Sequence, residues 1–176
     1  MKARAVAVAI VSLVIASSFA WAQKGTVQVQ PEDRLAKMLP ATVFLDGENV
    51  PTQKRNSVLL DVGGKLAVVS LIDTTGYSAA YQQKYAGVIL TVGGLKLGDK
   101  TLSSGSYGFG ETKVGEHDQA VVTVHVYDLG GKEIASISTT RENNMKGVRP
   151  VQVVVAPDGS AQLYLGPYHT SIAAAK

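Results

Sequence analysis

Short apolar segments joined by tight turns constrain this chain more than any other feature. Glycine at such turns accepts the left-handed backbone that a two-residue β-hairpin needs. The connections are also too short for repeated parallel crossovers, which need roughly a dozen residues each. The sequence therefore predicts a mostly antiparallel fold. The clearest turn pairs are Gly63-Gly64, Gly130-Gly131 and Asp158-Gly159, each between two apolar segments.

About nine or ten short strands are predicted between residues 41 and 176, which we expect to form a single β domain. The fold class is all-β, a mostly antiparallel sandwich or small barrel, with one or two short helices. An N-terminal segment, 23–40, begins with loose polar residues and carries one helix that starts at Pro31 and stops before Pro40. One apolar stripe of this helix needs a partner surface; it consists of Leu35, Met38 and Leu39.

Residues 1–22 have the layout of a secretory signal peptide. A basic start precedes an apolar run, and Ala20-Trp21-Ala22 forms a small-x-small cleavage pattern. The apolar run is shorter than the roughly 20 residues of a membrane-spanning helix. We therefore expect cleavage after Ala22, a periplasmic or secreted protein, and no transmembrane anchor after cleavage. The chain has no cysteine, which excludes disulfides and thiolate chemistry.

The charge of the chain does not indicate nucleic-acid binding. The net charge of +3 falls to +1 without Lys2 and Arg4, and the basic residues form no dense patch in the sequence. The longest polar connection, 139–150, offers three cations to an acidic partner, with a solvated loop as the alternative. These cations are Arg141, Lys146 and Arg149.

The segment GYSAAYQQKY (76–85) spaces three tyrosines four residues apart, which predicts a short helix with a tyrosine face. Ser78 suits its N-cap and Gly87 its end. Since so short a helix is unstable alone, the tyrosine face must dock on something. Either the rings pack on the sheet with their hydroxyls at its margin, or they bind a sugar or aromatic ligand. The candidate ligand-binding residues are Tyr77, Tyr81 and Tyr85.

Two further candidates come from predicted strands. In GSYGFGE (105–111), Tyr107 lies opposite Gly108 and Gly110, and glycines on one face let another element or a ligand approach the backbone. Packing beneath another element is the favoured interpretation. His125 alternates with valines, so it faces away from the core or into a more polar cavity.

Catalysis receives little support. Gly76-Tyr77-Ser78-Ala79-Ala80 is close to the G-x-S-x-G turn of serine hydrolases, but residues 73–75 separate it from the preceding strand. Ser78 is therefore a weak catalytic candidate. No metal motif is present and no cofactor is expected. One metal arrangement remains open, made of His117, His125 and His169; these histidines, with Asp118, are also the available partners for Ser78.

Several stretches resemble a group of secreted bacterial β-rich proteins of unknown function. They are LPATVFLDG (39–47), RNS (55–57), IDTTGYSAAYQQKY (72–85) and SYGFG (106–110). The segment VGGLKLGDKTLSSGSYGFG is similar to part of a second uncharacterised secreted β family. The resemblance implies an exported β domain and brings no established activity and no catalytic residues.

The sequence favours an exported, non-catalytic binding or structural module of the bacterial envelope or extracellular space. Its partner is expected to be a small ligand, a glycan or an envelope protein. The alternatives are a small secreted hydrolase that uses Ser78 and an assembly protein that pairs through a sheet edge.

Overall fold

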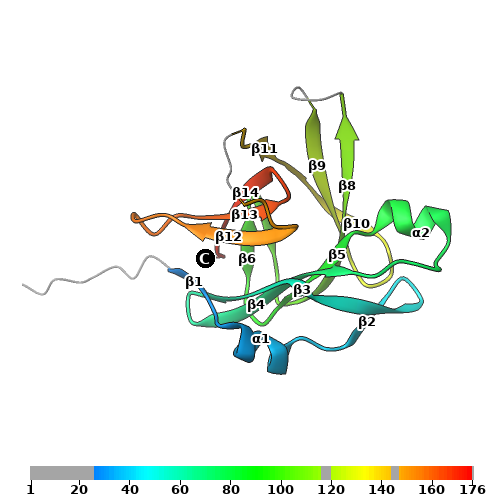
Figure 1. Ribbon diagram of the computed structural model, residues 1–176, viewed down its shortest axis with the longest axis horizontal. Helices are drawn as coiled ribbons and strands as arrows, with labels where there is room; N and C mark the ends of the chain where they lie inside the picture. Colours follow the sequence, from blue (N-terminus) through cyan, green and yellow to red (C-terminus); the bar gives the residue numbers. More distant parts are fainter. Residues whose placement is uncertain (1–25, 116–119, 144–146, 176) are drawn as a thin grey trace, which may run out of the picture.

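The computed structural model describes residues 26–115, 120–143 and 147–175. They form two packed antiparallel sheets with two short helices (Figure 1), which confirms the all-β fold class. The expected signal peptide, His117, Asp118 and Lys146 lie outside the described residues.

The first sheet has eight strands in the order β1-β3-β4-β5-β8-β9-β10, and β2 pairs with the other half of β3. The strands are β1 (Val27–Val29), β2 (Thr42–Leu45), β3 (Glu48–Val62), β4 (Lys65–Ile72), β5 (Gly87–Thr91), β8 (Gly105–Val114), β9 (Val121–Tyr127) and β10 (Glu133–Ser138).

The second sheet has six strands in the order β12-β13-β14-β6-β7, and β11 pairs with β14. The strands are β6 (Leu95–Leu97), β7 (Lys100–Leu102), β11 (Thr140–Arg141), β12 (Val151–Val155), β13 (Ala161–Leu165) and β14 (Tyr168–Ala174). Both sheets are open and end in edge strands, so the architecture is a sandwich and not a barrel.

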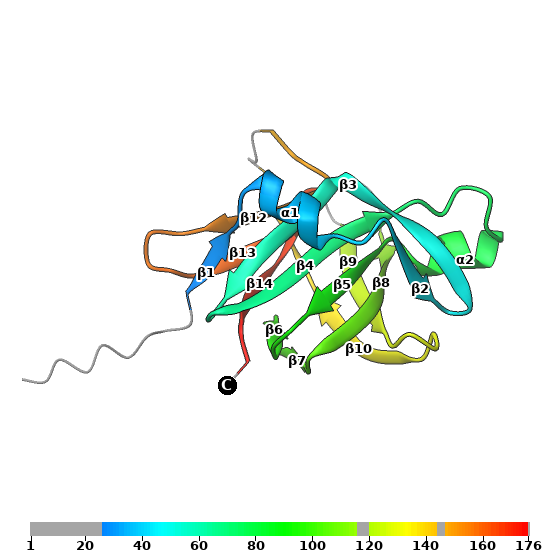
Figure 2. The ribbon, with the colours of Figure 1, turned by 90° about the horizontal axis from the view of Figure 1, so that it is seen from below.

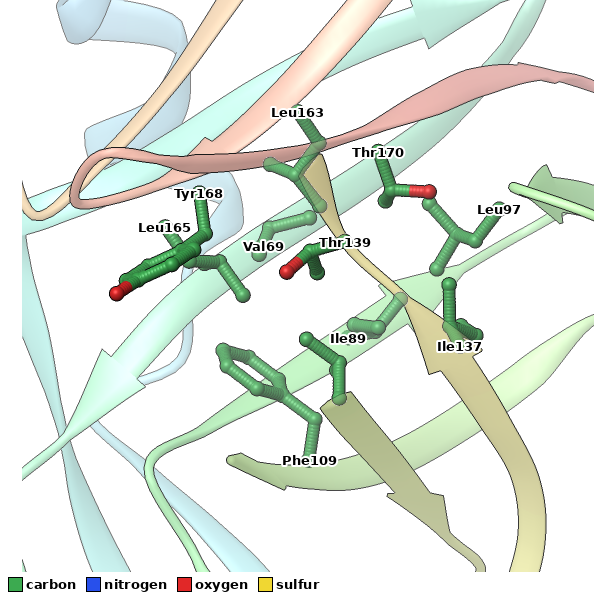
Figure 3. Close-up of a pocket in the computed structure, with 11 residues that line it drawn as sticks. Val69, Ile89, Leu97, Phe109, Ile137, Thr139, Leu163, Leu165, Tyr168 and Thr170 are labelled. Carbon is green, nitrogen blue, oxygen red and sulfur yellow. The ribbon is translucent and has the colours of Figure 1, made fainter. Parts of the chain in front are cut away.

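The main core lies between the two sheets, because side chains alternate between the two faces of each strand. In one register row of the first sheet, Val58, Val69 and Ile89 point inward, and the next row, with Leu59 and Val68, points outward. Figure 3 shows side chains of both sheets converging on the centre of this core. The space between them is about 10 Å³, the size of one water molecule, so the core is closely filled.

Two helices cover the outer face of the first sheet at different places (Figure 2). Helix α1 (Glu32–Met38) buries Leu35 against Leu59 and Val68. Helix α2 (Ala79–Lys84) covers a second cluster, which includes Leu45, Ile72 and Val88. The apolar stripe predicted for α1 is therefore only partly buried, since the Met38 side chain at its end is 47% exposed.

The structure differs from the sequence prediction in three places. The supposedly loose segment 23–30 contains β1, which pairs with β3, so the sandwich begins at Val27. The described residues form more strands than nine or ten, because β6, β7 and β11 are only two or three residues long. Gly87 does not end the helix but lies in β5, where a Cβ would overlap the Phe109 ring and the Ser70 carbonyl oxygen.

Candidate functional site

The three tyrosines of 76–85 lie on one side of the α2 segment, as their spacing predicts, although only Tyr81 is within the helix and Tyr85 is its C-cap. Ser78 is the N-cap, and its hydroxyl accepts a hydrogen bond from the Tyr81 amide at 3.2 Å. Tyr81 is 8% exposed and Tyr85 2% exposed, whereas Tyr77, outside the helix, is half-buried. The rings of Tyr81 and Tyr85 are therefore enclosed against the sheet and offer little surface to a ligand.

All three tyrosine hydroxyls donate to the β2–β3 hairpin. Tyr77 donates to the Asn49 carbonyl at 2.6 Å, and Tyr81 to the Leu45 carbonyl at 3.0 Å. Tyr85 donates to the Asp46 carboxylate at 2.9 Å. These bonds attach α2 to the hairpin, in the way that the packing hypothesis describes.

An ion pair closes the same cluster. The Lys84 ammonium lies 2.9 Å from Asp46 Oδ2 and over the Tyr85 and Tyr127 rings, 5.0 and 5.2 Å from their centroids. The hydrogen bond from Lys84, with that from Tyr85, lowers the pKa of Asp46. Burial raises the pKa of Tyr81 and of Tyr85 above the ordinary value, because the charged phenolate is poorly solvated there.

Gly108 and Gly110 of β8 lie beneath α2. A Cβ at Gly108 would come within 2.9 Å of the Tyr85 ring, and one at Gly110 would overlap the Lys84 carbonyl oxygen. The glycines thus let the helix approach the sheet, which is the packing role favoured above. Tyr107 lies on the opposite face of the same strand, packs against the main core and donates to the Ser103 carbonyl at 3.0 Å.

His125 is on the outer face of β9, where its Nδ1 lies 3.1 Å from Glu133 Oε1. The valines that alternate with it are buried, as predicted; they are Val122, Val124 and Val126. The rings of His125 and Tyr127 stack with centroids 6.5 Å apart, so His125 extends the tyrosine cluster. The structure therefore brings Tyr77, Tyr81, Tyr85 and His125 to one face and Tyr107 to the other.

The described part of the chain contains neither a serine–histidine pair for hydrolysis nor a cluster of metal ligands. Ser78 is used as a helix cap, and no hydrogen bond joins it to His125 or His169. No group of three or more His, Asp or Glu side chains among these residues is placed to hold a metal ion. Neither described helix is long and apolar enough to cross a membrane.

A different region contains a cleft of about 530 Å³ with a mixed polar and apolar lining. We call it the basic cleft. It lies where α1, the middle of β3 and the start of β12 meet, and Figure 2 shows these three elements side by side. Its lining residues are Glu32, Leu35, Lys54, Arg55, Asn56, Ser57, Arg149, Pro150 and Val151.

A bulge in β3 forms one wall of the basic cleft. The register with β4 shifts between Thr52 and Ser57, so the intervening residues leave the ladder and turn outward. The bulge is held by its own hydrogen bonds, from Asn56 Nδ2 to Gln53 Oε1 at 2.6 Å and from Gln53 Nε2 to the Ile72 carbonyl at 2.9 Å. Lys54 and Arg55 therefore extend from a fixed stretch of backbone.

Ser57 connects the bulge to the buried interior of the sheet. Its hydroxyl lies 2.7 Å from both the Gln53 carbonyl and the hydroxyl of Ser70. Ser70 is fully buried and donates to the Leu71 carbonyl. This chain of hydroxyls satisfies the polar atoms beneath the bulge, which would otherwise destabilise the fold.

The charge of the basic cleft is unbalanced. Lys54, Arg55 and Arg149 form no ion pair or side-chain hydrogen bond within the described residues. One carboxylate, that of Glu32, lines the same space and is also unpaired there. The cleft therefore combines three unpaired cations with a single acidic group.

Sequence reasoning found only part of this cleft. It named Arg149 as a cation for an acidic partner, and the structure places Arg141 elsewhere, in β11. Lys54 and Arg55 were missed because TQKRN reads as a polar loop after Pro51. The available signal was the resemblance at RNS (55–57), which falls on the bulge.

Comparison of the chain with protein-family models, with curated proteins and with solved structures finds no match.

Proposed function

We propose that this protein is an exported, non-catalytic binding module that takes an anionic ligand in the basic cleft. The observation that carries the proposal is the meeting of Lys54, Arg55 and Arg149 around one concave space, without ion-pair partners in the described residues. Export rests on the signal-peptide layout of residues 1–22.

Anion binding follows from the chemistry of these side chains. Three cations around one space repel each other, and an anion between them removes this repulsion. Arginine presents a planar fork of N–H donors that matches a carboxylate or an oxyanion, and hydrogen bonds between charged partners are the stronger class. The volume of about 530 Å³ falls within the range of small-molecule sites.

The main core is too small for a ligand. Its space is about 10 Å³, against about 530 Å³ for the basic cleft. The tyrosine cluster is also filled, since Tyr81 and Tyr85 are buried and their hydroxyls are bonded. A ligand therefore finds room at the cleft and not at Tyr81 and Tyr85.

A binding role without catalysis fits the lining of the cleft. The one hydroxyl there, that of Ser57, is bonded to the Gln53 carbonyl and to Ser70. A nucleophilic serine instead needs a general base within hydrogen-bond reach.

Isothermal titration calorimetry at fixed ionic strength tests the proposal, with sulfate and malonate as probes. We expect both anions to bind, and we expect Arg55→Ala and Arg149→Ala each to weaken the affinity about tenfold or more, the loss of one charge-assisted contact. Lys113→Ala is the matched control, because it removes one charge from an exposed site on β8, outside the cleft. Equal affinities in all three variants would contradict the proposal.

Export has a separate test. Expression of the full chain in a bacterium, followed by fractionation and mass spectrometry, is expected to give a protein that begins at Gln23. A cytoplasmic protein that retains residues 1–22 would contradict this part.

A further inference from the structure

The basic cleft contains acceptors as well as cations. Glu32 contributes a carboxylate, and Asn56 contributes a side-chain carbonyl whose amide nitrogen is already bonded to Gln53. Neither acceptor has a hydrogen-bond donor among the described residues. A ligand that carries only anionic oxygens would donate to neither acceptor and would be repelled by Glu32.

Hydroxyl donors on the ligand suit these acceptors better than an ammonium group does. Three cations against one carboxylate leave the cleft positive, so a ligand ammonium would be repelled by Lys54, Arg55 and Arg149. A hydroxyl group carries no charge and still donates to a carboxylate or an amide oxygen.

Part of the cleft wall is apolar. Leu35 and Val151 are buried and Pro150 is exposed, and all three line the cleft beside the charged groups. Such a surface favours a ligand with C–H groups on one side, since burial of apolar area is stabilising in proportion to its extent. An inorganic anion has no such group.

We infer that the basic cleft binds a sugar acid, a carbohydrate unit that carries a carboxylate together with ring hydroxyls, an inference that rests on the proposed function. The carboxylate pairs with Arg55 and Arg149. Ring hydroxyls donate to Glu32 and Asn56, and the C–H side of the ring packs on Leu35 and Pro150.

The variant Glu32→Gln provides the decisive test, because it is expected to change the affinities for sulfate and for a sugar acid in opposite directions. Sulfate donates no hydrogen bond at neutral pH, so Glu32→Gln is expected to strengthen sulfate binding by several-fold, through the loss of a repulsive charge. The same variant is expected to weaken trigalacturonate binding by about threefold to tenfold, because the loss of a charged acceptor for hydroxyls outweighs the relief of repulsion on a carboxylate already paired with Arg55 and Arg149.

The calorimetric experiment compares four probes on the full protein at fixed ionic strength: trigalacturonate, its methyl ester, sulfate and glutamate. Trigalacturonate is expected to bind most tightly, and its methyl ester at least tenfold more weakly, since it lacks the charge. Asp33→Asn is the matched control, as it removes an acid from the same helical turn without touching the cleft. Circular dichroism confirms that both variants are folded; Glu32 and Asp33 are exposed.

Each outcome decides the matter. Tightest binding of trigalacturonate, with opposite responses to Glu32→Gln, supports the inference. Sulfate binding that equals or exceeds trigalacturonate binding overturns it and leaves the anion site in place. Preferential binding of glutamate overturns it in favour of an amino acid or a peptide end. Failure of every anion overturns the proposed function and the inference together.

Discussion

The backbone carbonyl of Lys84, in the last turn of α2, lies directly against the Cα of Gly110 in β8. No side chain separates the helix from the sheet at this point, and even a methyl group would occupy the space of the carbonyl oxygen. The position of α2, and with it that of the tyrosines, therefore depends on a residue without a side chain.

Gly110→Ala is expected to lower the free energy of unfolding by about 2–3 kcal/mol, the upper part of the range for overpacking, because the obstacle is backbone. Urea unfolding followed by circular dichroism measures the change. Gly130→Ala is the matched control: its backbone is not left-handed, and its new Cβ would meet only Asp128 Oδ1 at 3.4 Å. Equal stabilities of the two variants would show that α2 does not rest on Gly110.

Tyr85→Ala is expected to cost about 3–5 kcal/mol of unfolding free energy, as for other buried aromatic truncations. The ring is 2% exposed, and its hydroxyl bonds to Asp46. Tyr77→Phe, which removes one hydroxyl from a half-buried ring, is expected to cost about 1 kcal/mol. Urea unfolding measures both, and a stable Tyr85→Ala variant would mean that the ring is free for a ligand after all.

High pH is expected to destabilise the protein through Tyr81 and Tyr85. Burial raises the pKa of both groups above 10.0 in the folded state, so their contribution is complete below pH 10 and is lost as the pH rises further. The ultraviolet absorbance of tyrosinate, recorded with circular dichroism, is expected to show these two groups ionising only as the fold is lost. Ionisation of all tyrosines near pH 10 in an intact fold would contradict this.

Low pH is expected to weaken the fold through Asp46. Its pKa is lowered in the folded state below 3.8, so its contribution is present above that pH and is lost as the pH falls through the folded pKa. Because Asp46 and Lys84 are each about one-third exposed, the effect is below about 1 kcal/mol. In the Asp46→Asn variant, asparagine tolerates the positive φ of 52° at this position as aspartate does. The melting temperature of this variant is expected to depend less on pH in the acid range. An unchanged pH profile in the variant would exclude Asp46 as the cause.

Ser57→Ala is expected to weaken anion binding without removing any charge from the basic cleft. The change removes the hydroxyl that donates to the Gln53 carbonyl and leaves a gap beside the fully buried Ser70, at a cost of about 1–3 kcal/mol. The bulge that presents Arg55 then becomes less rigid. Calorimetry with sulfate measures the affinity, and Ser103→Ala, at an exposed position outside the cleft, is the control. Unchanged affinity would show that the bulge does not need Ser57.

Much of the fold was predictable because its signals are local. The strand at 65–72, the Gly63-Gly64 hairpin and the Ser78 cap each depend on neighbouring residues, and the structure has them where the sequence predicts. The strands β1, β6 and β7 have three residues each, too few to show a period. Distant segments pair with β1 and β6, which lie beside β3 and β14, and β7 is the edge strand that pairs with β6.

The candidate site likewise has parts with local sequence signals and parts that depend on contacts between distant segments. The tyrosines are four residues apart, so the sequence shows their common face, although not that a hairpin encloses it. The basic cleft combines three separate segments, near Glu32, Arg55 and Arg149. These segments meet because β12 packs beside β3. No pattern of neighbouring residues in the sequence predicts this packing.

The place of β14 in the second sheet has a consequence for how the chain reaches its fold. This strand, close to the C-terminus, lies between β13 and β6, and it pairs Ile172 with Leu97. Before β14 is synthesised, β6 and β7 can pair only with each other, and they have no link to the rest of the second sheet. The second sheet can therefore be completed only after residues 168–174 have been synthesised. Such pairing between distant segments favours slow folding, because the loop between them must close before their contacts form.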